Sequence, residues 1–288
     1  MIYLYLSLLS SSAIFLLFKT FTRYNVNTLQ AIVLNYFTAT VLGLALVSGE
    51  LSGGEISYSP LIRNGALLGF LFIGLFYLMA KISQDMGAGI SSVATKLSLV
   101  IPAIFFMFFD NSDSFSWLKI TALLVAIPGI YFTVYSKGSG KFSLLLPLIL
   151  FLGSGFLDIV LAYTDQHYAH SNSDKILLTF LPFMVAGTTG ISILIGSKKN
   201  NLKFTRPTVI AGVVLGLINF ASIFFLLKTF DSISLAKSQI IPINNLGIVI
   251  ISSITAFILL KERLSSINVI GLTISGSAIL ILLVESYI

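Results

Sequence analysis

The chain lacks cysteine and carries few charged residues. None of its 288 residues is cysteine, which excludes disulfides and metal sites built on thiolates. Charged residues make up 10% of the sequence, hydrophobic residues make up 56%, and the mean hydropathy is +1.00. Ordinary soluble domains contain roughly 25% charged residues. The composition therefore excludes an ordinary soluble protein and predicts a protein that lies in a lipid bilayer.

Sequence motifs of membrane enzymes are also missing. There is no His-Glu-x-x-His, no Gly-x-Ser-x-Gly, no phosphate-binding loop and no pair of aspartates suited to Mg²⁺-diphosphate. His167 and His170, with Asp165 or Asp174, could bind a metal, but a polar external loop is the simpler interpretation. We expect no enzymatic activity, no metal and no cofactor. Without an ATP-binding domain, transport would depend on a gradient or on exchange.

Long apolar runs are what the sequence has in abundance. About 20 apolar residues in a helix cross the roughly 30 Å of bilayer hydrocarbon. We predict ten transmembrane helices, at residues 2–21, 29–48, 62–83, 89–109, 116–136, 143–164, 175–196, 208–229, 237–260 and 266–285. The first run lacks the preceding basic segment of a cleavable signal and is expected to be retained. The short loops leave no room for a separate domain, so function must lie within an all-α integral membrane bundle.

Basic residues favour one side of this bundle. Eleven lie in the loops after the odd-numbered predicted helices: Lys19, Arg23, Lys81, Lys137, Lys141, Lys198, Lys199, Lys203, Arg206, Lys261 and Arg263. Five follow the even-numbered helices: Arg63, Lys119, Lys175, Lys228 and Lys237. Cytoplasmic loops carry the excess of Lys and Arg. The imbalance predicts cytoplasmic odd loops and two non-cytoplasmic termini, and it explains the net charge of +6 without nucleic acid as a partner.

An internal repeat divides the chain. Its marks are two glycines four residues apart and a lysine ending the next apolar run: Gly65, Gly69 and Lys81, then Gly212, Gly216 and Lys228. A shift of 147 residues superposes the two sets, and a shift of 149 places Ala122 on Gly271. We predict two five-helix repeats, 1–140 and 141–288. Five crossings are an odd number, so the second repeat is inverted, as in secondary transporters that bind substrate between repeats near the midplane.

Two ionisable residues lie inside predicted helices. An ionisable side chain at a helix centre costs about 2.5 to 3.5 kcal/mol on insertion scales, so each needs a reason. Lys96 could neutralise a carboxylate or phosphate of a substrate, or its stem could reach the nearer interface. Asp158 could carry a coupled proton or pair with a substrate amine, or it could make a structural hydrogen bond. A shared cavity for both residues would suit a zwitterion.

Uncharged polar residues complete the candidate substrate site. Shifts of 148 and 149 residues place Lys96 on Asn244 and Asn245, close to Gln239 and Pro242 in the ninth helix. Amides here could bind substrate or hold helices together. A second tier of candidates consists of Asn35, Tyr36, Tyr77 and Asn219. The repeated glycines Gly65, Gly69, Gly212 and Gly216 are expected to pack helices closely rather than to contact a ligand.

Three features together resemble EamA-type members of the drug/metabolite transporter superfamily. They are the paired five-helix halves, the segment Gly153-Ser154-Gly155-Phe156, and the turn Lys261-Glu262-Arg263-Leu264-Ser265 before a helix with Gly271 and Gly276. Asn35-Tyr36 departs from the Arg-Phe pair of many relatives, so an anion-binding arginine is not carried over. The resemblance covers essentially the whole chain and implies this fold and a transport role.

Composition, repeat and resemblance together give one functional expectation. We expect a secondary active transporter in a bacterial inner membrane, a monomer or weak dimer, that moves a small polar or amphipathic metabolite by alternating access. Export of amino acids, with protons as a second partner, is the favoured form. A multidrug or lipid-precursor exporter of the same fold, and a non-transporting membrane sensor or scaffold, remain alternatives.

Overall fold

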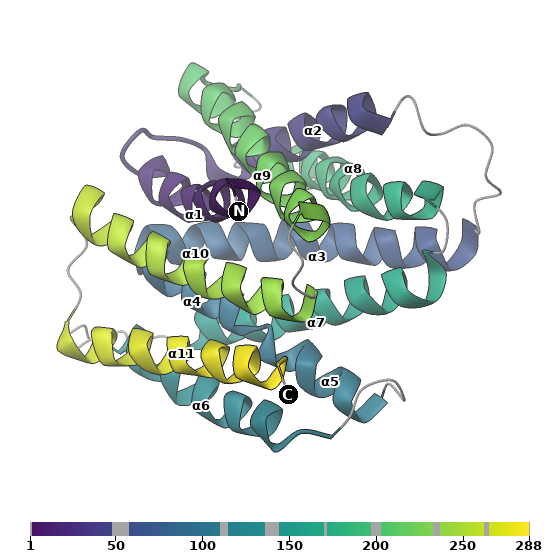
Figure 1. Cartoon of the computed structure of the whole chain (residues 1–288). Coiled ribbons are helices and arrows are strands. Elements are labelled where there is room, and N and C mark those ends of the chain that lie inside the picture. Colours follow the sequence, from purple (N-terminus) through teal and green to yellow (C-terminus); the bar gives the residue numbers. More distant parts are fainter. Residues whose placement is uncertain are drawn as a thin grey trace. The chain divides into compact units, whose positions relative to one another are not determined.

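The chain is an all-α multi-pass membrane protein over the residues that the structure describes. A computed structural model describes residues 2–47, 58–109, 115–135, 144–169, 172–196, 203–232, 237–261 and 265–287. The helices in these ranges (Figure 1) are α1 (Ile2–Phe21), α2 (Thr28–Val47), α3 (Tyr58–Asp85), α4 (Ala88–Leu97), α5 (Val100–Phe109), α6 (Trp117–Val134), α7 (Leu145–Tyr168), α8 (Asn172–Gly196), α9 (Arg206–Ser232), α10 (Lys237–Leu259) and α11 (Ser266–Glu285). Nine predicted spans each overlap one of them, the span 89–109 overlaps both α4 and α5, and the outer ends agree to within about one helical turn.

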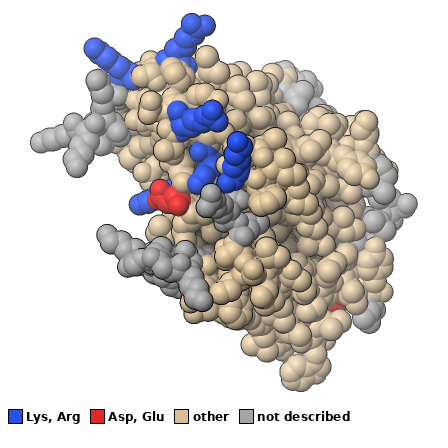
Figure 2. Space-filling model, turned by 90° about the vertical axis from the view of Figure 1, so that its left-hand side faces the viewer, with Lys and Arg blue, Asp and Glu red and all other residues tan. Residues whose placement is uncertain are grey.

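Most of these helices are long and apolar enough to cross a bilayer. Eight described segments are long and apolar enough, with α4 and α5 counted together as Ala88–Phe109. Trp117–Thr133 in α6 and Phe180–Gly196 in α8 are apolar but shorter. The surface agrees with this assignment, because most of the described face in Figure 2 is neither basic nor acidic.

The predicted helix 89–109 is interrupted. The structure ends α4 at Leu97 and begins α5 at Val100. Pro102 explains the break, because proline has no backbone N–H and its ring clashes with the carbonyl four residues earlier, here that of Ser98. That carbonyl instead accepts a hydrogen bond from the amide of Ile101, at 2.9 Å. The predicted span 89–109 thus corresponds to one membrane-crossing segment, Ala88–Phe109, that consists of two helices.

Helix contacts divide the chain into two compact units. Unit 1 comprises Met1–Lys19, Leu78–Phe156 and Ala221–Ile288, and unit 2 comprises Thr20–Tyr77 and Leu157–Phe220. Each unit contains helices from both predicted repeats. The predicted repeats 1–140 and 141–288 therefore do not coincide with the two compact units, each of which combines segments from both repeats.

Unit 2 contains pairs of equivalent contacts. A shift of 147 residues turns the residues of one contact into those of the other. A Cβ placed on Gly65 of α3 would lie 2.7 Å from Leu181 Cδ2 of α8, and one placed on Gly212 of α9 would lie 2.6 Å from Leu34 Cβ of α2. Gly65 and Gly212 are 147 residues apart, and so are Leu34 and Leu181. Reciprocal contacts of this kind arise when two copies pack through a two-fold relation.

The second glycine of each motif repeats the exchange. A Cβ on Gly69 would lie 2.9 Å from the carbonyl oxygen of Pro182, and one on Gly216 would lie 2.8 Å from that of Asn35. Pro182 is 147 residues after Asn35. Any side chain at either glycine would meet backbone, so the small residues allow close helix packing.

Unit 1 shows the same reciprocity between α6 and α11. A Cβ on Gly129 would lie 3.0 Å from the amide nitrogen of Ser275, and one on Gly271 would collide with the amide nitrogen of Thr133. The two helices therefore run antiparallel. Gly129 and Gly271 are 142 residues apart, as are Thr133 and Ser275. The contacts thus align α6 with α11 by a shift of 142 residues, whereas the prediction, which placed Ala122 on Gly271, used 149. The difference of seven residues is about two helical turns, so the same face of each helix is aligned.

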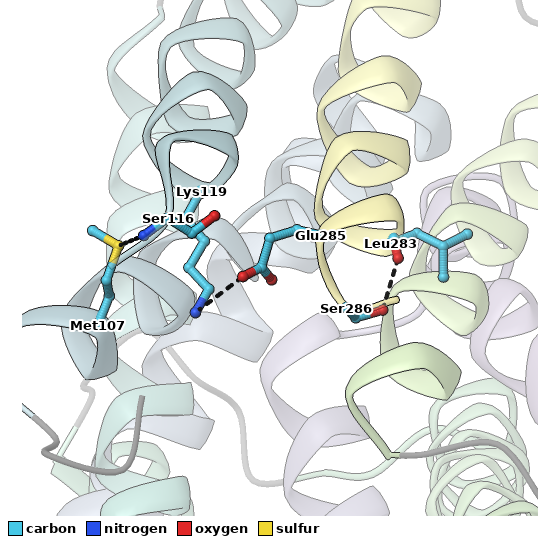
Figure 3. A network of polar contacts seen from close by, with 6 residues as sticks. All are labelled: Met107, Ser116, Lys119, Leu283, Glu285 and Ser286. Atoms are coloured by element: carbon cyan, nitrogen blue, oxygen red, sulfur yellow. Dashed lines mark hydrogen bonds and ion pairs between the residues drawn. The ribbon is translucent and has the colours of Figure 1, made fainter. Parts of the chain in front are cut away.

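Both ends of the α6–α11 pair carry polar links. At one end Lys119 Nζ lies 3.4 Å from Glu285 Oε1, and Figure 3 shows the two side chains directed at one another. Nearby, the amide of Ser116 donates to Met107 Sδ at 3.1 Å, which joins the end of α5 to the start of α6 (Figure 3). At the other end Ser265 caps α11 in a reciprocal capping box with Asn268.

Asn268 also caps the neighbouring helix. Its Nδ2 donates to the carbonyls of Thr133 at 2.8 Å and of Tyr135 at 2.9 Å, at the end of α6. Terminal carbonyls of a helix have no partner within that helix, so a side-chain donor satisfies them. One residue therefore stabilises the start of α11 and the end of α6.

Asn268→Ala is expected to lower the free energy of unfolding by about 1 to 3 kcal/mol, because it removes a cap and leaves carbonyls without their donor. Thermal unfolding of the detergent-solubilised protein measures the loss. Thr273→Ala is the control, since the hydroxyl of exposed Thr273 bonds the carbonyl of Val269 in its own helix. Equal unfolding temperatures for the two variants would contradict the assigned role of Asn268.

Candidate substrate-binding residues

Asn35 and Asn219 form a buried amide pair in unit 2. Asn35 lies in α2 with no exposed surface, and Asn219 lies in α9 at 6% exposure. Asn219 Nδ2 donates to Asn35 Oδ1 at 3.2 Å. Asn35 Nδ2 is buried without a hydrogen-bond partner among the described residues. Sequence had placed both residues in the second tier of candidates without predicting that they meet.

Tyr36, the next residue of α2, lies in an aromatic cluster. Its hydroxyl donates to the carbonyl of Phe72 at 2.8 Å. Its ring centroid lies 5.7 Å from that of Phe76 and stacks 6.1 Å from that of Phe183. Phe183 follows Tyr36 by 147 residues, so two equivalent positions of the repeat contact each other. Tyr36 is thus buried in an aromatic cluster of unit 2.

Asn244 is a buried polar position of unit 1. It lies in α10 at 3% exposure and its Oδ1 accepts from the hydroxyl of Ser7 in α1 at 3.1 Å. The Ser7 hydroxyl also lies 3.2 Å from the carbonyl of Ser222 in α9. Three helices thus meet at this serine. Asn245 is half-buried, and Gln239 belongs to α10 with its side chain outside those described.

Lys96 lies in the last turn of α4, immediately before the helix break, and is half-buried. The end of a helix carries a partial negative charge, which stabilises a nearby cation. The Pro102 break therefore gives Lys96 a local stabilisation that a continuous helix would not supply. A charge at this place in a membrane-spanning segment remains a candidate for binding an anionic group.

Asp158 and Tyr77 are the remaining candidates, and both are partly accessible. Asp158 is half-buried in α7, and the exposed fraction of Tyr77 in α3 is 45%. Asp158 belongs to unit 2 and Lys96 to unit 1. A shared site for the two charges remains a prediction.

The predicted external loop is partly helical. Helix α7 continues to Tyr168, so exposed His167 lies on a helix, where its ring stacks on that of Tyr163 at 4.2 Å. The second histidine, His170, lies outside the described residues. Within the described ranges, no group of three or more histidine, aspartate or glutamate side chains could hold a metal ion.

Serine contacts are the part of the polar interior that sequence reasoning missed. Ser252 of α10 donates to Ser92 of α4 at 2.7 Å, and a Cβ on Gly89 would lie 3.2 Å from the hydroxyl of Ser253. These contacts show that α4 and α10 run antiparallel. Serine is common in transmembrane helices as a packing residue, so neither Ser92 nor Ser7 carried a signal that distinguished it from other serines.

Comparisons with known proteins extend over the whole chain. No model of a known protein family matches it. A protein of Haemophilus influenzae (strain ATCC 51907 / DSM 11121 / KW20 / Rd), described as uncharacterized, is 29% identical over 282 residues, which cover 95% of this chain and 94% of that protein. A solved crystal structure covers 98% of each chain with a TM-score of 0.59 and 12% identity. At that identity the likeness concerns the fold alone, which extends over the full length of the chain.

Proposed function

We propose that this protein is a ten-helix, inverted-repeat secondary transporter of the EamA type that moves a small polar or amphipathic metabolite by alternating access. Amino acids are the favoured cargo and export the favoured direction. The proposed location is the bacterial inner membrane, and a relative from a bacterium is consistent with it. Asn35, Asn219, Asn244 and Lys96 are the proposed substrate-binding residues, and Asp158 is the proposed proton carrier.

The reciprocal helix contacts carry this proposal. Helices at equivalent places in the predicted repeats pair with each other: α2 with α8, α4 with α10, and α6 with α11. Each pair runs antiparallel; in α2 and α8, for example, Gly187 approaches Phe37 and Gly190 approaches Val33. Equivalent helices that run in opposite directions are what an inverted repeat produces. Inverted repeats support alternating access, because two similar halves can exchange conformations.

The charge distribution within unit 2 supports the proposed orientation. The starts of α2 and α9 lie together, since the amide of Asn27 donates to Thr208 Oγ1 at 3.1 Å. The start of α3 and the end of α7 are joined in the same way by Asn64 and Thr164, at 3.0 Å. Charged residues of unit 2 near the first end are Arg23, Lys203 and Arg206, and those near the second are Arg63, Asp165, Asp174 and Lys175. The basic end is the proposed cytoplasmic end, which leaves both termini outside.

Uptake and counterflow in proteoliposomes test the proposal. We expect saturable flux of one class from a panel of labelled amino acids, nucleosides and cationic drugs. A pH gradient is expected to change that flux if protons are coupled. Liposomes containing a heat-unfolded sample of the same protein are the control for leak.

The alternatives predict other results from the same panel. Saturable flux restricted to the cationic drugs would favour a multidrug exporter of the same fold. No saturable flux of any compound, from protein shown to be folded by its thermal transition, would contradict transport of these metabolites and favour the sensor.

A further inference from the structure

The unpartnered amide of Asn35 is the feature that the proposed function leaves unexplained. A buried donor without an acceptor loses its hydrogen bonds to water and gains none in return. Buried polar groups in native proteins are almost always paired, and an exception calls for a water, an ion or a ligand. Asn35 Nδ2 has no exposed surface and no acceptor among the described residues. Asn35 Nδ2 therefore keeps the capacity to donate a hydrogen bond beside α2.

The repeat shows that this polar contact is specific to one side of unit 2. The shift of 147 residues maps Asn35 onto Pro182 of α8 and Asn219 onto Phe72 of α3. The α2–α9 contact thus contains two amides at positions where the equivalent α8–α3 contact contains a proline and a phenylalanine. The glycine packing around both contacts is otherwise alike. Close packing alone does not require the amides, because the apolar counterpart packs as closely without them.

The α2–α9 contact is also suited to opening. Gly212 and Gly216 present no side chains of their own to α2, so at these two positions opening requires Leu34 and Thr38 of α2 to leave a glycine surface rather than to disengage from interlocked side chains of α9. The hydrogen bond from Asn219 to Asn35 crosses this contact. Opening would free Asn35 Oδ1 and expose its Nδ2. At the equivalent positions of the α8–α3 contact, Pro182 and Phe72 have no side-chain group that could form a hydrogen bond with a polar substrate.

We propose that Asn35, on the opened α2–α9 face, is a specificity-determining residue that donates from Nδ2 to an oxygen acceptor of the substrate, namely a carboxylate. The inference rests on the proposed transport function and names the chemical class of its cargo. The free group is an N–H, so the ligand atom must be an acceptor. A carboxylate accepts more strongly than a neutral carbonyl, because hydrogen bonds to a charged partner are roughly twice as strong.

The test compares an amino acid with its decarboxylated amine in proteoliposomes, using the best amino acid from the panel. Wild-type protein is expected to prefer the amino acid. Asn35→Leu keeps a similar volume and removes the donor, and it is expected to reduce this preference about tenfold or more, mainly through KM. Asn35→Asp keeps the shape and replaces the donor by a negative acceptor, and it is expected to shift the preference toward the amine.

Pro182→Leu is the matched control, because it introduces the same side chain at the equivalent position of α8. It is expected to retain the wild-type preference. Ligand-induced thermal stabilisation in detergent gives a second readout for variants that fold but transport slowly: the amino acid should stabilise wild type and Pro182→Leu, and should stabilise Asn35→Leu far less.

The outcomes separate this inference from the proposed function. If wild type transports an amino acid and both Asn35 variants keep its preference over the amine, the inference is overturned and the transporter stands; the missing acceptor is then a trapped water. If folded wild type shows no saturable flux and no ligand stabilisation, both proposals are overturned.

Discussion

Replacement of Gly271 by alanine is expected to lower the free energy of unfolding by more than about 3 kcal/mol. A Cβ at this position would lie 2.5 Å from the carbonyl carbon of Phe132 and 2.6 Å from the Cα of Thr133, besides colliding with the Thr133 amide nitrogen. These are backbone atoms of α6, and a rotamer change cannot move them. The helices would have to separate, which would pull Asn268 away from the carbonyls of Thr133 and Tyr135.

Gly276→Ala provides the control in the same helix. Among the residues that the structure describes, a Cβ there would meet Leu246 Cδ1 alone, at an ordinary contact distance of 3.5 Å. Alanine is the better helix former, so this variant is expected to unfold at or slightly above the wild-type temperature. The measurement is thermal unfolding in detergent, with the yield of monodisperse protein as a second readout. Similar yields and unfolding temperatures for the two variants would show that α6 and α11 do not pack this closely.

Lys96→Met is expected to lower flux of a carboxylate substrate at least tenfold while leaving the protein folded. Methionine has a similar length and suits the bilayer, so the loss would reflect the missing charge rather than poor packing. Hydrogen bonds to charged groups contribute about 1.5 to 3 kcal/mol, which corresponds to one or two orders of magnitude in binding. Initial rates in proteoliposomes at several substrate concentrations separate KM from maximal flux.

Two further variants complete this experiment. Lys81→Met, in the exposed last part of α3, is the control and should keep wild-type flux. Asp158→Asn tests the proton role separately: it should retain exchange of labelled for unlabelled substrate and lose the response to a pH gradient. Unchanged flux in Lys96→Met would contradict the substrate-binding role of Lys96. The helix dipole at the C-terminal end of α4, which favours a cation, would then be enough to explain the residue.

The helical segments were predictable because the bilayer imposes one length and one composition on them. The break between α4 and α5 was harder to predict. Transmembrane helices tolerate proline when other groups satisfy the freed carbonyls, and both outcomes occur in this chain. Pro102 separates two helices, whereas Pro128 and Pro242 lie inside α6 and α10. The residues that pack around each proline determine whether the helix breaks there. A pattern of hydrophobicity does not identify those residues.

The glycine spacing predicted an internal repeat and identified close helix contacts, but it did not predict which residues of the fifth helices meet. Small residues recur along α6 and α11; the sequence comparison aligned Ala122 with Gly271, whereas the reciprocal contacts align Gly129 with Gly271. The individual polar residues could be identified from the sequence, because a polar side chain within a membrane-spanning helix costs free energy and so needs a reason. Their partners could not, because Ser7 and Asn244 are joined only by tertiary packing across 237 residues.

The interleaving of the two units has a consequence for biosynthesis. All segments of unit 2 have been synthesised once the chain reaches Phe220, whereas unit 1 needs residues up to Ile288. Chains fold as they emerge, at about 5 to 20 residues per second. Unit 2 can therefore assemble while the ribosome is still translating α10 and α11. Helix α6 is completed later, because Asn268, which caps its last carbonyls, is synthesised with α11. Premature termination after α9 would thus yield a chain with one complete unit and one that lacks its central helix pairs, a species that membrane quality control would have to recognise and remove.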